Sequence, residues 1–209
     1  FRGIQAEVED SMKQKIARFC NVTPGAVFVS PDFQKSIYEL PVIFHKQGLD
    51  AMILSKLGLG NRTTDIRQWT DFLEKLSNPA KKIRIGMVGK KDYLDNCYKS
   101  VHESLFHAAV TGNNAELTVK KIDAETLEKT QDIDQVFADV DGIVVPGNYG
   151  QRGFLGLLAT VRYAREHKIP FLGIDLGMQL MAIDTARSLC GWEDADTTEF
   201  IQNSTHPVI

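Results

Sequence analysis

The chain has 209 residues, of which 43% are hydrophobic and 24% charged, with a formal net charge of -3 and a pI near 6.0. This composition is typical of a globular protein with an ordinary core, and the weak charge argues against nucleic acid or anionic lipid as a partner. The longest apolar stretch, around residues 153–161, is too short to cross a bilayer. We therefore expect no membrane partner and a cytoplasmic location.

The cysteines give no sign of a metal site or a disulfide framework. Cys20, Cys97 and Cys190 lie far apart in the sequence and have no histidine at metal-ligand spacing. We expect reduced thiols and no bound metal. Because the sequence starts at Phe1 and stops directly after an apolar pair, we also expect it to be a fragment of a longer protein.

The first part of the chain is predicted to be mainly helical. Apolar residues at helical spacing predict a helix over residues 6–19, and a short strand is expected over 26–29. A second helix is predicted over 41–57, ending at Gly58. A third begins after Thr64 and Asp65 and stops at residues 78–79, and we interpret it as an interdomain linker. The predicted domains are residues 1–59, a linker over 60–82, and residues 83–209.

Beyond residue 82 strands and helices alternate. Segments rich in β-branched residues predict four strands, over residues 83–89, 117–122, 142–147 and 171–175. Four helices are expected between and after them, over residues 94–109, 124–137, 153–167 and 177–189. This alternation predicts an α/β fold with a parallel sheet covered on both faces. Ligands and catalytic groups are then expected at the carboxyl ends of the strands.

The loop after the third predicted strand is rich in glycine. Glycines at positions 147, 150 and 153 permit positive φ and close backbone approach, so backbone amides can point at a bound oxygen. An ordinary strand-to-helix turn explains the same pattern equally well.

The segment after the fourth predicted strand has the form of a nucleophile elbow. In residues 171–180 Asp175 stands between Gly173 and Gly177, whose missing side chains allow a tight strand-to-helix turn. An ordinary explanation exists here too, because aspartate is a good N-cap and suits the positive end of a helix dipole. Taken alone, this segment favours the cap. The five histidines, at positions 45, 102, 107, 167 and 206, show no paired ligand spacing and predict no catalytic group.

Taken in order, many short motifs resemble those of CTP synthases over the whole chain. The early ones are Lys15-Ile16, Phe19-Cys20, Ser36-Ile37-Tyr38, Pro41 and Gln47-Gly48-Leu49. The later ones are Tyr98-Lys99-Ser100-Val101, the Val-Pro-Gly of residues 145–147 with its glycine-rich loop, Arg152-Gly153, residues 162–166, 169–174 and 176–180, Thr198-Glu199-Phe200 and residues 206–209.

The resemblance implies an enzyme that phosphorylates UTP with ATP and aminates it with ammonia released from glutamine. It further implies a flavodoxin-like class I glutamine amidotransferase domain, incomplete at its C-terminus, preceded by the end of an α/β amidoligase domain and a helical linker. Family positions assign the nucleophile to Asp175. They assign the glutamine and oxyanion contacts to the glycine loop, to the helix after Asp175 and to Glu199. These contact positions are Gly147, Asn148, Tyr149, Gly150, Leu176, Gln179 and Glu199.

The sequence departs from the family at these positions. Asp175 stands where the family has its cysteine, Asn148 where it has a second loop glycine, and Leu155 where it usually has glutamate. Phe1-Arg2-Gly3 likewise replaces Cys-Arg-Ser. A carboxylate is a poor nucleophile towards an amide, so we predict no useful glutaminase activity. Asn148 tolerates positive φ, but its side chain is expected to crowd the glutamine pocket.

Three interpretations remain open from the sequence. The protein is a CTP synthase restricted to free ammonia, or a non-catalytic pseudo-amidotransferase retained for regulation or assembly, or an enzyme in which Asp175 attacks some other substrate. No phosphate-binding glycine loop occurs in this sequence, so ATP and magnesium are expected only in the N-terminal part of the family's proteins, which precedes this segment. GTP is a candidate activator. Glutamine remains a candidate ligand, and family resemblance predicts self-association into tetramers or filaments.

Overall fold

The computed structural model describes residues 8–30, 36–60 and 62–209. The predictions that involve Phe1-Arg2-Gly3, and the first two residues of the helix predicted over 6–19, lie outside these ranges. The chain forms two compact units, Phe1–Asn78 and Pro79–Ile209, which are described separately. The sequence-based domain boundaries after residues 59 and 82 stay a prediction.

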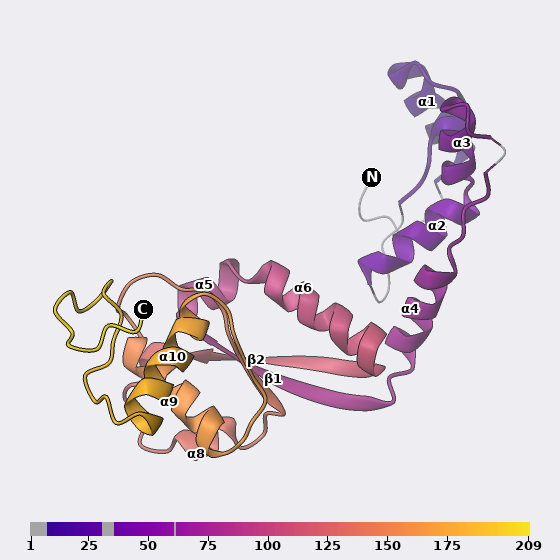
Figure 1. The fold of residues 1–209 in the computed structure, drawn as a ribbon. Coiled ribbons are helices and arrows are strands. Elements are labelled where there is room, and N and C mark those ends of the chain that lie inside the picture. Colours follow the sequence, from indigo (N-terminus) through magenta and orange to yellow (C-terminus); the bar gives the residue numbers. More distant parts are fainter. Residues whose placement is uncertain (1–7, 31–35, 61) are drawn as a thin grey trace. The chain divides into compact units, whose positions relative to one another are not determined.

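The first unit confirms a helix near the start of the described chain and corrects the strand predicted after it. Helix α1 spans Asp10–Cys20, and Asn21 ends it in the left-handed conformation (Figure 1). Residues 26–29 form no strand: a 3-10 turn spans Pro24–Ala26 and extended backbone follows. The side-chain amide of Gln47 replaces a strand partner, because it accepts from the Val29 amide at 2.9 Å and donates to the Val29 carbonyl at 2.7 Å.

The helix predicted over residues 41–57 is two helices. A 3-10 turn over Ile37–Glu39 leads into α2, Leu40–Lys46, and α3 spans Leu49–Lys56. Gly48 lies between them with φ +80°, a left-handed conformation that breaks the helical hydrogen bonding.

The helix expected after Thr64 and Asp65 is present as α4, Arg67–Ser77. The Asp65 carboxylate accepts a hydrogen bond from the Arg67 amide at 3.0 Å, just before the first helical turn. Tyr38 stacks on Trp69 and meets Phe72 edge-on, so α4 packs on the rest of this unit through aromatic rings.

The second unit confirms the parallel sheet. Its strands are β1 (Lys81–Gly89), β2 (Ala115–Asp123), β3 (Gly142–Val145) and β4 (Phe171–Gly173). They pair in the order β2-β1-β3-β4, with every pairing parallel. The last two strands are shorter than predicted.

Helices cover both faces of this sheet, as the alternation predicted. The helices are α5 (Lys91–Asn96), α6 (Lys99–His107), α7 (Ala124–Leu127), α8 (Ile133–Phe137), α9 (Phe154–Glu166) and α10 (Leu176–Leu189). Figure 1 shows α5 and α6 on one side of β1 and β2, with α8 and α9 on the other. Two predicted helices are interrupted: 94–109 divides between α5 and α6 and continues into a π-helical turn over Ala108–Gly112, and 124–137 divides between α7 and α8.

The period of two along the strands divides the core into two layers. Val88, Ile143 and Val145 pack with Leu157 and Leu180 from α9 and α10. Their neighbours in the strands, Met87 and Val144, face the opposite way and pack with Leu94 and Tyr98. Because strands in a parallel sheet share one direction, all four carboxyl ends lie along one edge.

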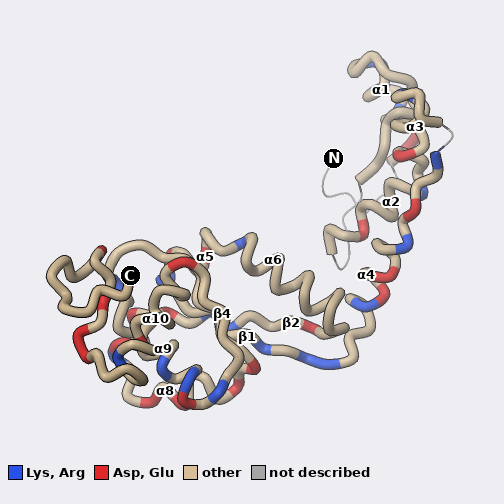
Figure 2. Tube along the Cα trace, viewed as in Figure 1, with Lys and Arg blue, Asp and Glu red and all other residues tan. Residues whose placement is uncertain are grey.

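Acidic and basic residues are interspersed along the helices and loops of both units, as Figure 2 shows. Within the described ranges, no helix is long and apolar enough to cross a membrane.

Candidate active site

The candidate site lies where β3 and β4 end side by side. Val145 pairs with Gly173 in the register of these strands, so the glycine loop after β3 and the turn after β4 start at the same edge. The Ile174 amide donates to the Val145 carbonyl at 2.9 Å and ties the start of the turn to β3. The two segments singled out from the sequence therefore meet in space.

Asp175 forms the bend between β4 and α10. Its backbone has φ +53° and ψ -114°, a combination that side-chain-bearing residues rarely adopt. Its carbonyl accepts from the amides of Met178 and Gln179, which begins the helix immediately. The side chain is exposed and makes no capping hydrogen bond, so the N-cap explanation is wrong. A strained backbone that presents an exposed side chain is the geometry of a nucleophile elbow.

The two glycines beside the bend are required by close backbone contacts. A Cβ atom on Gly173 would lie 2.4 Å from the carbonyl carbon of Gly177. One on Gly177 would lie 2.2 Å from the Val145 carbonyl oxygen. The collisions expected from the sequence are confirmed, because only hydrogen fits at either position.

The glycine loop faces the bend through Gly147. A Cβ atom on Gly147 would lie 3.1 Å from Oδ2 of Asp175. Gly150 and Gly153 have φ of +73° and +79°, which explains why glycine occupies both positions. The loop therefore packs against the side chain at the elbow through Gly147.

Asn148 is buried within this loop, with only 4% of its surface exposed. Its Oδ1 accepts a hydrogen bond from the Tyr149 amide at 3.0 Å. Its Nδ2 finds no hydrogen-bond partner among the residues that the structure describes. Buried polar atoms without a partner are rare and destabilising, so this side chain is not explained by folding alone. Tyr149, in contrast, is 75% exposed.

The remaining predicted contact residues are placed around the same edge. Leu176 is buried at the first position of α10, and Gln179 follows one turn later. Glu199 is exposed, next to Phe200. Phe200 meets the ring of Phe154 edge-on at 5.3 Å and accepts a hydrogen bond from Gln151, so this segment packs against the end of the glycine loop.

Two residues that the sequence did not assign to the site donate hydrogen bonds to carbonyl groups of this loop. Lys90 follows β1 directly, is 5% exposed, and donates from Nζ to the Tyr149 carbonyl. Tyr98 precedes α6, is 9% exposed, and donates from its hydroxyl to the Gly147 carbonyl at 2.8 Å. Lys90 could have been suspected, because it stands at the carboxyl end of a strand. Tyr98 gave no such signal beyond its place in a family motif.

Charges near the loop are paired or desolvated. Burial, reinforced by the positive charge of Arg152, lowers the pKa of Lys90. Burial also raises the pKa of the Tyr98 hydroxyl, which keeps it protonated as a donor at neutral pH. Arg152 itself pairs with Asp92 at 2.7 Å and with Glu125 at 3.0 Å.

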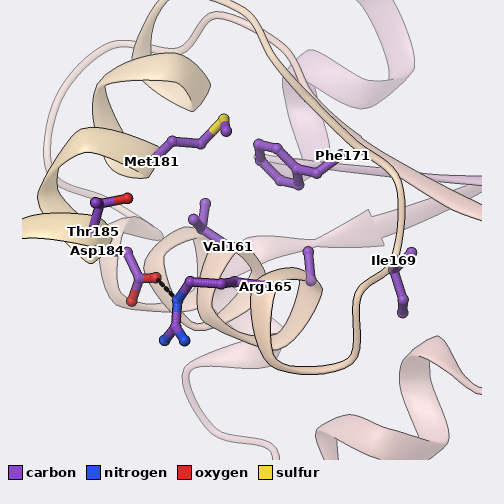
Figure 3. Close-up of a pocket in the computed structure, with 8 residues that line it drawn as sticks. Val161, Arg165, Ile169, Phe171, Met181, Asp184 and Thr185 are labelled. Atoms are coloured by element: carbon purple, nitrogen blue, oxygen red, sulfur yellow. Dashed lines mark hydrogen bonds and ion pairs between the residues drawn. The ribbon is translucent and has the colours of Figure 1, made fainter. Parts of the chain in front are cut away.

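A pocket beside α10 is a separate feature. A pocket of about 240 Å³ lies between α9, α10 and the start of β4, lined by apolar residues with Arg165, Asp184 and Thr185 (Figure 3). Asp184 is 1% exposed and accepts from Arg165 Nε at 2.7 Å, which explains the buried carboxylate. This pocket reaches Phe171, the first residue of β4, whereas Asp175 follows the last one. It carries no group of the candidate site.

Two of the histidines have other partners in the structure. His206 lies 2.6 Å from Asp194 and stacks on Trp192, while His167 stacks on Tyr163. Over residues 8–30, 36–60 and 62–209, no cluster of histidine, cysteine and carboxylate side chains could hold a metal ion.

Comparison with known families identifies both parts of the chain. Residues 93–208 match the family model for glutamine amidotransferase class-I, and residues 2–59 match that for the CTP synthase N-terminus. A solved structure, the glutaminase domain of Trypanosoma brucei CTPS with bound acivicin, is similar with a TM-score of 0.53 and 36% identity. That likeness covers 59% of this chain and 48% of the other.

Curated relatives match along nearly the full chain. CTP synthase from Syntrophus aciditrophicus is 40% identical over 202 residues, which is 97% of this chain and 37% of the relative. CTP synthase from Fibrobacter succinogenes is 44% identical over 195 residues, 93% of this chain and 34% of the relative. The chain thus spans just over a third of the length of these relatives. It belongs to the class-I glutamine amidotransferase family, and its two parts together place it in the CTP synthase family.

Proposed function

We propose that this chain is part of a CTP synthase-like protein that aminates UTP with free ammonia, because its glutaminase half does not hydrolyse glutamine. The observation that carries the proposal is the backbone of Asp175, which has the strained elbow conformation at the position where the family has cysteine. An elbow presents its central side chain to substrate. A carboxylate presented there cannot replace a thiolate.

The chemistry of the side chain decides this outcome. Attack by a carboxylate on an amide would form an anhydride and expel a poor leaving group, so the acyl-enzyme step is lost. Loss of the nucleophile from a catalytic triad costs on the order of a million-fold in rate, or about 8 kcal/mol of barrier. The residual contribution of loop amides does not compensate for a loss of that size.

Glutamine binding is a separate matter from hydrolysis. The residues that we propose for it are Gly147, Asn148, Tyr149, Gly150, Leu176, Gln179 and Glu199, and the meeting of the segments after β3 and β4 supports this assignment. Tyr149 has the exposed aromatic ring that would face glutamine or an activating GTP. ATP and magnesium would be held elsewhere in the protein. The family resemblance supports the proposal that the protein assembles with further copies in the cytoplasm.

A second candidate is a non-catalytic module that regulates or assembles with active CTP synthase. The observation that favours it is Asn148, whose side chain is buried within the loop and is a second departure beside the one at Asp175. Two changes at one site indicate that the pocket is no longer maintained for glutamine hydrolysis.

One assay separates these proposals. The protein as its gene encodes it is supplied with UTP, ATP and magnesium, and CTP formation is measured with ammonium chloride or with L-glutamine as the nitrogen donor. We expect turnover with ammonium alone. Turnover with glutamine would refute the proposed role of Asp175, and no CTP with either donor would favour the non-catalytic module.

A matched pair of variants locates the defect. Asp175→Cys restores the family nucleophile, whereas Asp175→Ser supplies a small side chain with a much weaker nucleophile. Ammonia release from glutamine is expected to rise only with Asp175→Cys, while ammonium-dependent CTP formation stays the same in both.

A further inference from the structure

Two carbonyl groups of the glycine loop accept hydrogen bonds from buried side chains outside the loop. Tyr98 donates its hydroxyl to the Gly147 carbonyl at 2.8 Å, and Lys90 donates from Nζ to the Tyr149 carbonyl. The two donors come from opposite ends of α5, at the carboxyl end of β1. The loop is therefore anchored at alternate residues by the neighbouring strand-to-helix segment.

Peptide geometry converts these two anchors into a constraint on the amides. In a planar trans peptide the carbonyl and the following N–H point in opposite directions. With the Gly147 carbonyl turned towards Tyr98, the Asn148 amide is turned away from it. The Gly150 amide is likewise turned away from Lys90. Gly147 lies beside the Asp175 carboxylate, so the peptide that carries the Asn148 amide starts next to the elbow.

The burial of the anchors makes the constraint stiff. Tyr98 and Lys90 are 9% and 5% exposed, so water competes little for the two carbonyls. Gly89 fits against the Tyr98 ring, where a Cβ atom would lie 3.2 Å from ring carbon Cε2. The Lys90 ammonium lies 5.6 Å from the Tyr93 ring centre, a further contact that keeps it in place.

We propose that Tyr98 and Lys90 are positioning residues that orient the Asn148 and Gly150 amides as hydrogen-bond donors to a carboxylate or amide oxygen bound beside Asp175. Preorganised amides of this kind bind an oxygen without first having to reorder the loop. The inference deepens the proposed function, on which it relies for glutamine as the ligand. Neither residue is assigned a chemical step.

The test combines a spectroscopic signal with binding. In ¹H–¹⁵N spectra of the chain, Tyr98→Phe is expected to shift the Asn148 amide signal, and Lys90→Met the Gly150 signal. Titration with L-glutamine should show affinity lowered about tenfold in each variant, which corresponds to one lost hydrogen bond. Tyr163→Phe is the matched control: it removes a hydroxyl from a tyrosine of the other core layer, so it should leave both amide signals and the affinity unchanged.

The outcomes are distinguishable from those of the proposed function. Thermal unfolding checks that each variant folds, and Lys90→Met gives an independent reading if Tyr98→Phe does not. Unchanged Asn148 and Gly150 signals in both variants would overturn the inference, as would an equal loss of affinity in Tyr163→Phe. Absence of glutamine binding in the unsubstituted chain, with the expected amide shifts present, would support the anchoring and count against glutamine as the ligand.

Discussion

Gly147 and Asp175 approach each other so closely that a single methyl group on Gly147 would lie 3.1 Å from the Asp175 carboxylate oxygen Oδ2. These residues follow different strands, and the pairing of β3 with β4 brings them together. The approach places the glycine loop directly in front of the side chain at the elbow. Substitutions at position 175 therefore test both the backbone strain of the bend and the chemistry of its side chain.

Replacing Asp175 by glycine is expected to stabilise the fold. The φ of +53° with ψ -114° is strained for aspartate and accessible to glycine, while glycine adds entropy to the unfolded chain. Relief of strain should prevail, raising the free energy of unfolding by about 1 kcal/mol. Urea denaturation measures it, with Asp175→Ala as the control that removes the carboxylate but keeps the strain. Equal stability of the two variants would show that the bend stores no strain.

Adding a methyl group beside the bend should be severely destabilising. Gly177→Ala places Cβ 2.2 Å from the Val145 carbonyl oxygen, and both partners are buried backbone. The strands or α10 must move, which is expected to cost about 3 kcal/mol or more. Gly112→Ala is the matched control, because nothing lies within 4 Å of a Cβ atom there. A mild effect of Gly177→Ala in denaturant titrations would contradict the close packing of β3 against α10.

Asn148 is expected to limit any activity that a restored nucleophile brings. Its Oδ1 accepts a hydrogen bond from the Tyr149 amide, and its side chain is buried within the loop. In the protein that carries Asp175→Cys, adding Asn148→Gly should raise ammonia release from glutamine about tenfold or more, the scale on which freed backbone donors act. Asn148→Gly with Asp175 retained should stay at background. Full activity from Asp175→Cys alone would show that Asn148 does not obstruct the site.

The Asp194 carboxylate should titrate unusually low. Hydrogen bonds from Thr205 and then from His206 lower the pKa of Asp194 from 3.8 to about 2. Because the pKa of Asp194 is lower in the folded than in the unfolded chain, the carboxylate stabilises the fold fully above about pH 4. This stabilisation is lost as the pH falls towards 2. Carboxyl ¹³C shifts should show this pKa rising in Thr205→Val. Asp50, whose pKa is also about 2, lies in the other unit and serves as the internal control.

The sequence predicted the parallel sheet because its signals are local. Runs of β-branched residues marked the four strands, and Gly173 and Gly177 marked the turn that needs them. Breaks inside helices were missed where one residue decides them: Gly48 at φ +80° divides α2 from α3 although the apolar spacing continues. The false strand over 26–29 has the same origin, since a side-chain amide from Gln47 satisfies the backbone of Val29 where no strand does.

By itself the sequence determined the α/β alternation, the family and the identity of the residue at the elbow, because these depend on residue types and short spacings. Only the tertiary structure decided that Asp175 makes no helix cap, that it faces Gly147, and that Tyr98 and Lys90 hold the loop. The last two facts depend on contacts between residues 28 to 59 positions apart. Such contacts form only when parallel strands bring their carboxyl ends to one edge, and no local pattern of residues encodes them.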